Sequence, residues 1–198
     1  MAVPVEHEKR KSEILEKALE LFIEEGYEDV TFQKVADRCG ITRTTLYIYF
    51  NNKRDIFMFS IKQLGQTLED SLNSIIANNS LSAKDRLKEV MMDVYKCCIE
   101  HRKLFSVLLL YLLQIQKTGV NTEEKVRRRT IKLRHLLSSI LIEGMETGEF
   151  KKIDIKAAND ICYGLIESLI YRLAILNQED IPNFERMVNL TVDGFCAS

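Results

Sequence analysis

The sequence has little of what marks β-rich or membrane proteins. It contains two prolines, Pro4 and Pro182, and no alternating apolar pattern of the kind that indicates strands. Its longest strongly apolar run, residues 104–113, is shorter than the roughly 20 residues that a membrane helix needs. The N-terminus has no apolar signal segment. We therefore expect an all-helical protein that is cytoplasmic and has no membrane partner.

Residues that carry chemistry are also scarce. There is no Gly-rich phosphate loop and no Ser-His-Asp spacing, and three histidines offer few general bases. The cysteines are odd in number and lack metal-ligand spacing, so they fit small apolar residues in a reducing environment. These are Cys39, Cys97, Cys98, Cys162 and Cys196. The sequence therefore predicts neither an enzyme nor a cofactor or metal site.

The most informative stretch is residues 31–54, TFQKVADRCGITRTTLYIYFNNKR. It predicts two short helices joined by a tight turn, followed by the start of a third. Ala36 supplies the small side chain that lets the two helices cross closely. Gly40 supplies a residue that adopts positive φ without strain, and Leu46 fills the angle between the helices. This spacing is typical of a helix-turn-helix, whose second helix enters a DNA major groove.

The distribution of charge agrees with DNA binding by one small face. The formal net charge of the chain is −1, so the protein as a whole is not a basic nucleic-acid binder. Residues 31–54, however, contain five Lys or Arg and one Asp, a local net charge of +4. A local basic patch on a near-neutral chain suits a protein that touches DNA with a limited surface.

Apolar periodicity predicts about nine helices in two domains. We expect an N-terminal helix over 12–25, the two helices of the turn, and then one long helix from about 52 to 75. We place the boundary after residue 53, with a DNA-binding domain at 1–53 and an effector-binding and dimerisation domain at 54–198. No flexible linker separates them, because the long helix leads directly from one to the other.

The last two helices have more apolar surface than one core needs. Small and apolar residues form a second stripe over 157–175, and another stripe follows Pro182, so the pair fits a two-fold four-helix packing between subunits. A monomer that buries both faces by itself is the alternative. The expected interface residues are Ala157, Gly164, Ser168, Tyr171, Ile175, Phe184, Met187, Val188, Thr191 and Phe195.

Residues 12–59 closely resemble the TetR family of bacterial transcriptional regulators. The matching pieces are ILEKALELFIEEGYEDVT, VADRCGITRTTLYIYF and NKRDIF, of which Leu-Tyr-x-Tyr-Phe-x-Asn-Lys is the most specific. The resemblance covers the first third of the chain, and beyond it the likeness is architectural. It implies a homodimer that binds a palindromic operator and represses transcription. It also implies a small-molecule effector that binds the second domain and releases the DNA.

We expect the DNA contacts to come from α-helical residues near the turn. Arg43 can read a guanine through O6 and N7 or contact a phosphate. Gln33 is either a second base reader or a solvated amide. In the family pattern Tyr47 and Tyr49 face the DNA backbone. The complete expected set is Thr31, Gln33, Thr42, Arg43, Thr44, Tyr47, Tyr49 and Lys53.

Lys53 is expected in the first turn of the long helix, where the helix dipole disfavours a cation. A DNA phosphate at this point would reverse the sign of that effect, since it would meet both the lysine and the helix N–H groups. We therefore assign Lys53 to a phosphate contact, with an ordinary exposed lysine as the alternative.

Effector residues are chosen as polar or aromatic groups on otherwise apolar helices. They are Tyr95, Phe105, Tyr111, Gln114, Tyr163 and Glu167. Each of them can equally be a structural residue whose polar atoms are satisfied within the fold. The surrounding residues favour a largely apolar effector. Two other modes of regulation keep the same DNA-binding dimer: oxidation of Cys97 and Cys98, or recruitment of a protein partner.

Overall fold

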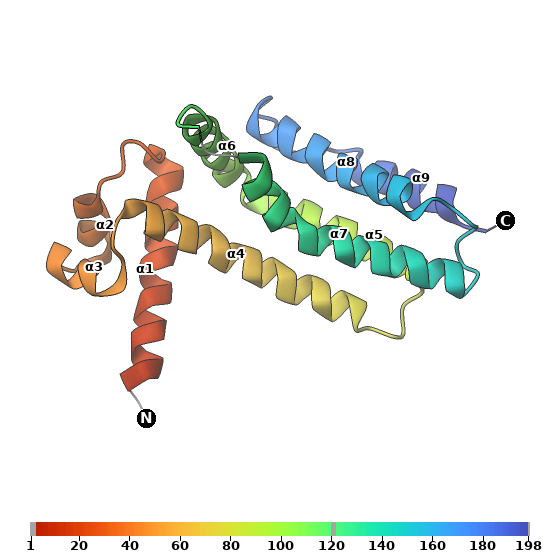
Figure 1. The fold of residues 1–198 in the computed structure, drawn as a ribbon, viewed down its shortest axis with the longest axis horizontal. Coiled ribbons are helices and arrows are strands. Elements are labelled where there is room, and N and C mark those ends of the chain that lie inside the picture. The colour runs from red at the N-terminus through yellow and green to blue at the C-terminus, as the bar shows by residue number, and fades with distance from the viewer. Residues whose placement is uncertain (1–2, 120–121, 198) are drawn as a thin grey trace. The chain divides into compact units, whose positions relative to one another are not determined.

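The computed structural model describes residues 3–119 and 122–197 (Figure 1). Over these residues the fold is helical, apart from one isolated bridge between Phe150 and Cys196. The helices in the described residues are α1 (Val3–Glu25), α2 (Phe32–Cys39), α3 (Arg43–Tyr49), α4 (Lys53–Ile76), α5 (Ala83–Glu100), α6 (Arg102–Gln116), α7 (Thr122–Glu146), α8 (Ile155–Ala174) and α9 (Phe184–Phe195). The prediction of an all-α chain with an N-terminal helix-turn-helix is confirmed.

The chain divides into two compact units within α4. The N-terminal unit ends at Thr67 and the C-terminal unit begins at Leu68. The first turns of α4 belong to the N-terminal unit because their side chains are buried there: Ile56 and Phe57 have no exposed surface. The buried hydroxyl of Ser60 also donates to the carbonyl of Leu15 in α1, at 2.9 Å.

The N-terminal unit is held by an aromatic cluster behind the turn. The ring of Phe22 from α1 packs edge-on against Phe57 from α4, with 4.9 Å between centroids. Tyr27, in the loop after α1, lies 5.8 Å from Phe22 and 5.0 Å from Phe57. Large aromatic side chains contribute much buried apolar area, so this cluster fixes α1, the loop and the start of α4 together.

The C-terminal unit is built around α8, which contacts α5, α6, α7 and α9 (Figure 1). Its buried residues include Leu87, Met91, Leu137, Ile166 and Leu169. One charged side chain is buried with them: Arg86 pairs with Glu143 of α7 and donates to the carbonyl of Ile76 at the end of α4. A buried cation needs such partners, so Arg86 ties α4, α5 and α7 together inside this unit.

The apolar stripe of α9 faces its own chain. Phe184, Val188 and Phe195, which were expected at a subunit interface, are buried in the core of the C-terminal unit. Phe184 stacks on Tyr95 of α5, with 4.8 Å between the ring centroids. Helical periodicity identified the stripe correctly, but the stripe is needed to close the core against α5 and α8.

No helix among the described residues is both long enough and apolar enough to cross a bilayer.

The close approach of α7 to Phe150 gives a test of this packing. A Cβ atom added at Gly144 would lie 2.1 Å from the Phe150 ring, and Phe150 is itself buried. We expect Gly144→Ala to lower the free energy of unfolding by about 1–3 kcal/mol, because the ring must move within a closed core. Denaturant unfolding followed by circular dichroism measures this.

Gly194→Ala in α9 is the matched control, since no heavy atom lies within 4 Å of the added Cβ. We expect it to change stability by about 1 kcal/mol or less, in the stabilising direction. Equal effects of the two substitutions would contradict the described packing of Phe150.

Candidate nucleic-acid interface

The turn between α2 and α3 is built by local hydrogen bonds. Thr31 caps α2, and its hydroxyl accepts from the backbone N–H of Lys34 at 3.2 Å. Gly40 ends α2 in the left-handed region, at φ 67°, and its N–H points to the carbonyls of Ala36 and Asp37. This conformation strains any residue with a Cβ atom. The sequence-based roles of Thr31 as a cap and of Gly40 as the turn residue both agree with this geometry.

The helix after the turn is fixed by a cap at its start and by buried residues behind it. Thr42 caps α3, and its hydroxyl accepts from the N–H of Thr45 at 3.1 Å and pairs with the Thr45 hydroxyl at 2.8 Å. Leu46 is completely buried and Phe50 nearly so. Because these side chains face inward, the opposite face of α3 is left on the surface.

The exposed face of α3 carries Arg43, Thr44, Tyr47 and Ile48. The guanidinium of Arg43 donates to the Tyr47 hydroxyl at 3.1 Å, and its carbon lies 5.7 Å from the centroid of that ring. Ile48 is 68% exposed, and sequence reasoning missed it. Its spacing of four residues from Thr44 was the available signal, because positions i and i+4 share a helix face.

Other residues expected at the DNA are engaged within the protein. The Gln33 amide donates to the carboxylate of Asp37 in the same helix, at 2.7 Å. Tyr49 is half-buried, and its ring stacks on His7 of α1 with 4.6 Å between centroids. The structure thus places Thr44, Arg43 and Tyr47 together on the surface of α3, whereas Gln33 and Tyr49 lie beside them with partners of their own.

The basic patch of residues 31–54 carries less unpaired positive charge than a count over the sequence indicates. Lys34 forms an ion pair with Glu25, and Arg38 forms one with Glu24, each at 2.5 Å. The ammonium of Lys53 donates to three backbone carbonyls. Of the five cations in residues 31–54, Arg43, Lys53 and Arg54 have no acidic partner among the residues that the structure describes. The acids that neutralise Lys34 and Arg38 come from α1, outside the window that was counted.

The six residues expected to line an effector site differ in burial and in their contacts. Tyr95 donates to Asp180, whereas Tyr111 and Tyr163 are buried on α6 and α8. Phe105 is half-buried against the core, and Gln114 and Glu167 are exposed. None of the six is among the residues that line the cleft found in the structure.

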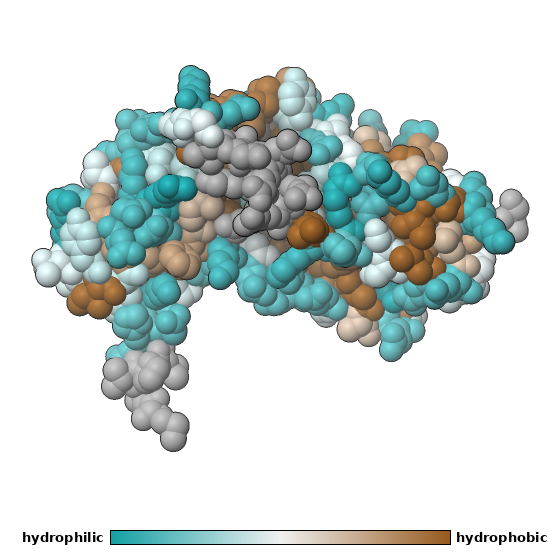
Figure 2. All heavy atoms as spheres, in the orientation of Figure 1, coloured by the Kyte–Doolittle hydropathy of each residue, from teal (hydrophilic) through white to brown (hydrophobic). Residues whose placement is uncertain are grey.

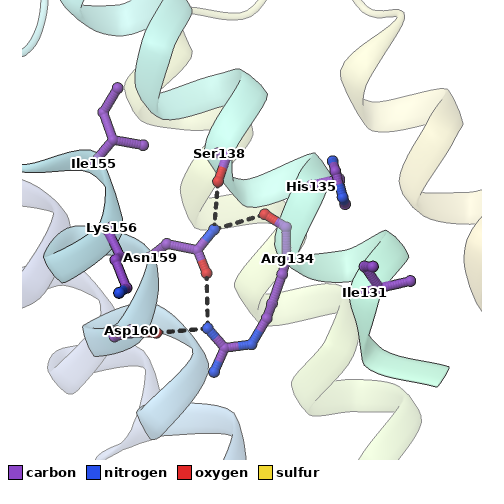
Figure 3. Close-up of a pocket in the computed structure, with 8 residues that line it drawn as sticks. All are labelled: Ile131, Arg134, His135, Ser138, Ile155, Lys156, Asn159 and Asp160. Carbon is purple, nitrogen blue, oxygen red and sulfur yellow. Dashed lines mark hydrogen bonds and ion pairs between the residues drawn. The ribbon is translucent and has the colours of Figure 1, made fainter. Parts of the chain in front are cut away.

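A cleft of about 530 Å³ lies instead between α7 and the start of α8 (Figure 3). Figure 3 shows Asn159 at its centre, where the amide donates to the Arg134 carbonyl at 2.6 Å and to the Ser138 hydroxyl at 2.7 Å. The Arg134 side chain pairs with Asp160 at 2.6 Å and lies 4.0 Å from the centroid of the Tyr163 ring. The lining residues are Ile131, Arg134, His135, Ser138, Ile155, Lys156, Asn159 and Asp160.

The cysteine pair has little thiolate character. Burial raises the pKa of Cys97 to about 11 and the pKa of Cys98 to about 12. The thiolate is the form that oxidants attack, and at neutral pH both groups are almost entirely thiols. This counts against regulation by oxidation of the pair. Within the described part of the chain, no group of three or more His, Cys, Asp or Glu is arranged to hold a metal ion.

Comparison with known proteins places this geometry in a family. Residues 14–58 match the family model of bacterial regulatory proteins, tetR family. The fatty acid metabolism regulator protein of Bacillus subtilis is 26% identical over 160 residues, which is 80% of each chain. The HTH-type transcriptional repressor AcnR of Corynebacterium diphtheriae is 24% identical over 194 residues, covering 96% of this chain and 93% of the relative.

Solved structures agree on the fold. A TetR transcription regulator from Haloarcula marismortui has a TM-score of 0.82 at 20% identity, covering 96% of this chain and all of the other. The transcriptional regulator FadR from Bacillus subtilis, in complex with stearoyl-CoA, has a TM-score of 0.71 at 24% identity, covering 92% of this chain and 98% of the other.

The capped turn, the exposed face of α3 and the helical unit that follows define a helix-turn-helix DNA-binding regulator. The match over residues 14–58 places this DNA-binding part of the chain in the TetR family of bacterial transcriptional regulators. These relatives are named as a regulator of fatty acid metabolism and as a transcriptional repressor, in agreement with the expectation that the protein is not an enzyme.

Proposed function

We propose that the protein is a repressor that binds a palindromic operator as a homodimer and is released by a small-molecule effector. The observation that carries the DNA-binding part is the exposed face of α3, which presents Arg43, Thr44, Tyr47 and Ile48 to solvent. A short helix that presents polar side chains on a capped, rigid turn has the geometry of a recognition helix in a major groove.

The chemistry of this face suggests a role for each side chain. Arg43 reads a guanine edge, because its planar fork matches O6 and N7. Thr44 and Ile48 offer methyl groups to thymine, and the Tyr47 hydroxyl contacts a phosphate. Thr31, Thr42 and Gln33 serve first as caps or helix partners and reach the DNA backbone with their remaining hydrogen-bonding capacity.

Support for a homodimer comes from the outward face of α8. Ile161, Tyr171 and Ile175 are each about half exposed, and they share one helical stripe with Gly164 and Ser168. On α9, Leu190 is 68% exposed beside the half-buried Met187 and Thr191. Figure 2 shows apolar side chains among polar ones over the helices of the C-terminal unit. Exposed apolar stripes on two adjacent helices suit a two-fold four-helix contact between subunits. The second subunit would supply a second helix-turn-helix for the other half of a palindromic operator.

For the effector, we infer a molecule with a long apolar chain and an anionic end. One relative is named as a fatty acid metabolism regulator, and one solved structure of this fold contains stearoyl-CoA. The cleft between α7 and α8 has Ile131 and Ile155 in its lining and carries the cations Arg134, which is paired with Asp160, and Lys156. We assign the anionic end of the effector to this cleft.

The assignment of Arg43 predicts how base preference responds to substitution. Arg43→Ala should cost about 1–3 kcal/mol of binding to a selected operator and relax the preference at one base pair. Arg43→Lys keeps the charge but loses the fork, so it should recover binding to all sequences without recovering that preference. Selection from a randomised duplex library, followed by titration of the best and of scrambled duplexes, measures both. If Arg43→Lys retains the wild-type preference, Arg43 contacts a phosphate.

The assignment of the α8 stripe predicts the state of association. Ile161→Glu places a charge in the proposed interface and should convert dimers into monomers, lowering operator affinity at least about tenfold. Leu110→Glu, at an exposed apolar position of α6, is the matched control and should remain dimeric. Sedimentation velocity gives the mass of each variant. A wild-type monomer, or a dimer that survives Ile161→Glu, contradicts this interface.

The effector assignment is tested with three probes: stearoyl-CoA, stearate and CoA. We expect stearoyl-CoA to raise the melting temperature and to release DNA, stearate to act more weakly, and CoA to have no effect. Lys156→Met should weaken the response to stearoyl-CoA, because it removes a cation from the cleft. Lys151→Met, outside the cleft, is the control. A response to CoA alone argues against an effector with a long apolar chain. Equal responses of the two variants argue against binding of its anionic end in the cleft.

A further inference from the structure

The ammonium group of Lys53 is surrounded by backbone oxygens of the loop between α1 and α2. Its Nζ atom lies 2.8 Å from the carbonyl oxygen of Tyr27 and 2.9 Å from those of Glu28 and Val30. It also lies 4.6 Å from the centroid of the Tyr27 ring. An ammonium has three hydrogen-bond donors, and these three carbonyls accept all of them. No donor remains for a DNA phosphate.

This arrangement answers the electrostatic question raised by the sequence. A lysine in the first turn of a helix is disfavoured by the helix dipole, so some negative group is expected beside it. Carbonyl oxygens are the negative ends of peptide dipoles, and here three of them supply what a phosphate was expected to supply. The sequence argument identified the need for a negative partner but not its source, because the loop lies 23 to 26 residues away in the chain.

The carbonyls belong to a segment that positions the DNA-reading helices. Residues 26–30 connect the end of α1 to Thr31, the cap of α2. A second lysine holds the other side of this segment: Lys34 of α2 donates to the carbonyl of Asp29 at 3.1 Å. The segment is therefore fixed from α4 by Lys53 and from α2 by Lys34. Movement of the segment would move the N-terminus of α2 and with it the turn and α3.

We propose that Lys53 is a positioning residue that clamps the 27–30 segment and so sets the orientation of α2 and α3, and that it does not contact DNA. The inference rests on the proposed function in one respect, that α3 binds DNA. It reverses the role expected from the sequence, in which Lys53 neutralised a phosphate.

Three variants separate the clamp from a phosphate contact. Lys53→Met keeps the aliphatic stem and removes the charge and the donors. Lys53→Arg keeps the charge, but its flat fork cannot place one nitrogen among three carbonyls. Arg54→Met removes a neighbouring charge from the same helical turn, and Arg54 has no acidic partner among the described residues. Binding is measured at several salt concentrations to a duplex selected by the wild-type protein from a randomised library.

Amide hydrogen exchange of the free protein supplies a readout that does not involve DNA. The N–H groups of Lys34 and Val35 are bonded to the side chain and the carbonyl of Thr31, so they report on the start of α2. We expect faster exchange in both in Lys53→Met and Lys53→Arg, but not in Arg54→Met. We also expect Lys53→Met to weaken binding at least about tenfold, with the slope of log affinity against log salt unchanged.

A phosphate contact gives the opposite pattern. Lys53→Met would then reduce the salt slope by about 0.9 with no change in exchange, and Lys53→Arg would bind like the wild type. Either result overturns the clamp. If Lys53→Met fails to fold, Lys53→Gln carries the same comparison, because its amide keeps two donors. If the wild-type protein selects no duplex, the proposed function fails, while the exchange data still decide whether the clamp exists.

Discussion

The left-handed conformation at Gly40 is the constraint on which the helix-turn-helix depends. It ends α2 and turns the chain, so that Ala36 and Leu46 are both buried while Arg43 stays on the surface. No heavy atom lies within 4 Å of the position that a Cβ atom at Gly40 would take. Glycine is therefore required by the backbone dihedral and not by lack of space. A local torsional preference thus decides which side of α3 faces outward.

Features set by local interactions were predictable from the sequence. The two threonine caps, the glycine turn and the long α4 depend on residues within a few positions of each other, and each was found where it was expected. The charge of the site was not predictable in this way. Glu24 and Glu25 neutralise Arg38 and Lys34 across the space between α1 and α2, and a count over a sequence window cannot include partners that only the fold brings near.

Helical periodicity likewise identifies an apolar face without identifying what covers it. The stripe of Phe184, Val188 and Phe195 was read correctly as apolar, yet it completes the core of its own chain. The outward stripe lies on α8, where the apolar side chains alternate with small ones. The cleft between α7 and α8 was missed for a related reason. Its walls include Ile131 from one helix and Ile155 from the other, and neither helix alone carries a sequence signal for a cleft.

The division of the chain within α4 has a mechanical consequence. Gly65 lies on this helix two positions before Thr67, the last residue of the N-terminal unit, and no side chain packs on it. A glycine inside a helix lowers helix stability by roughly 0.5–1 kcal/mol relative to alanine. Helix α4 joins the two units, and its intrinsic helix stability is thus lowest near the point where it passes from one unit to the other. Bending concentrated at this glycine would leave both the aromatic cluster at one end and the Arg86 contacts at the other end undisturbed.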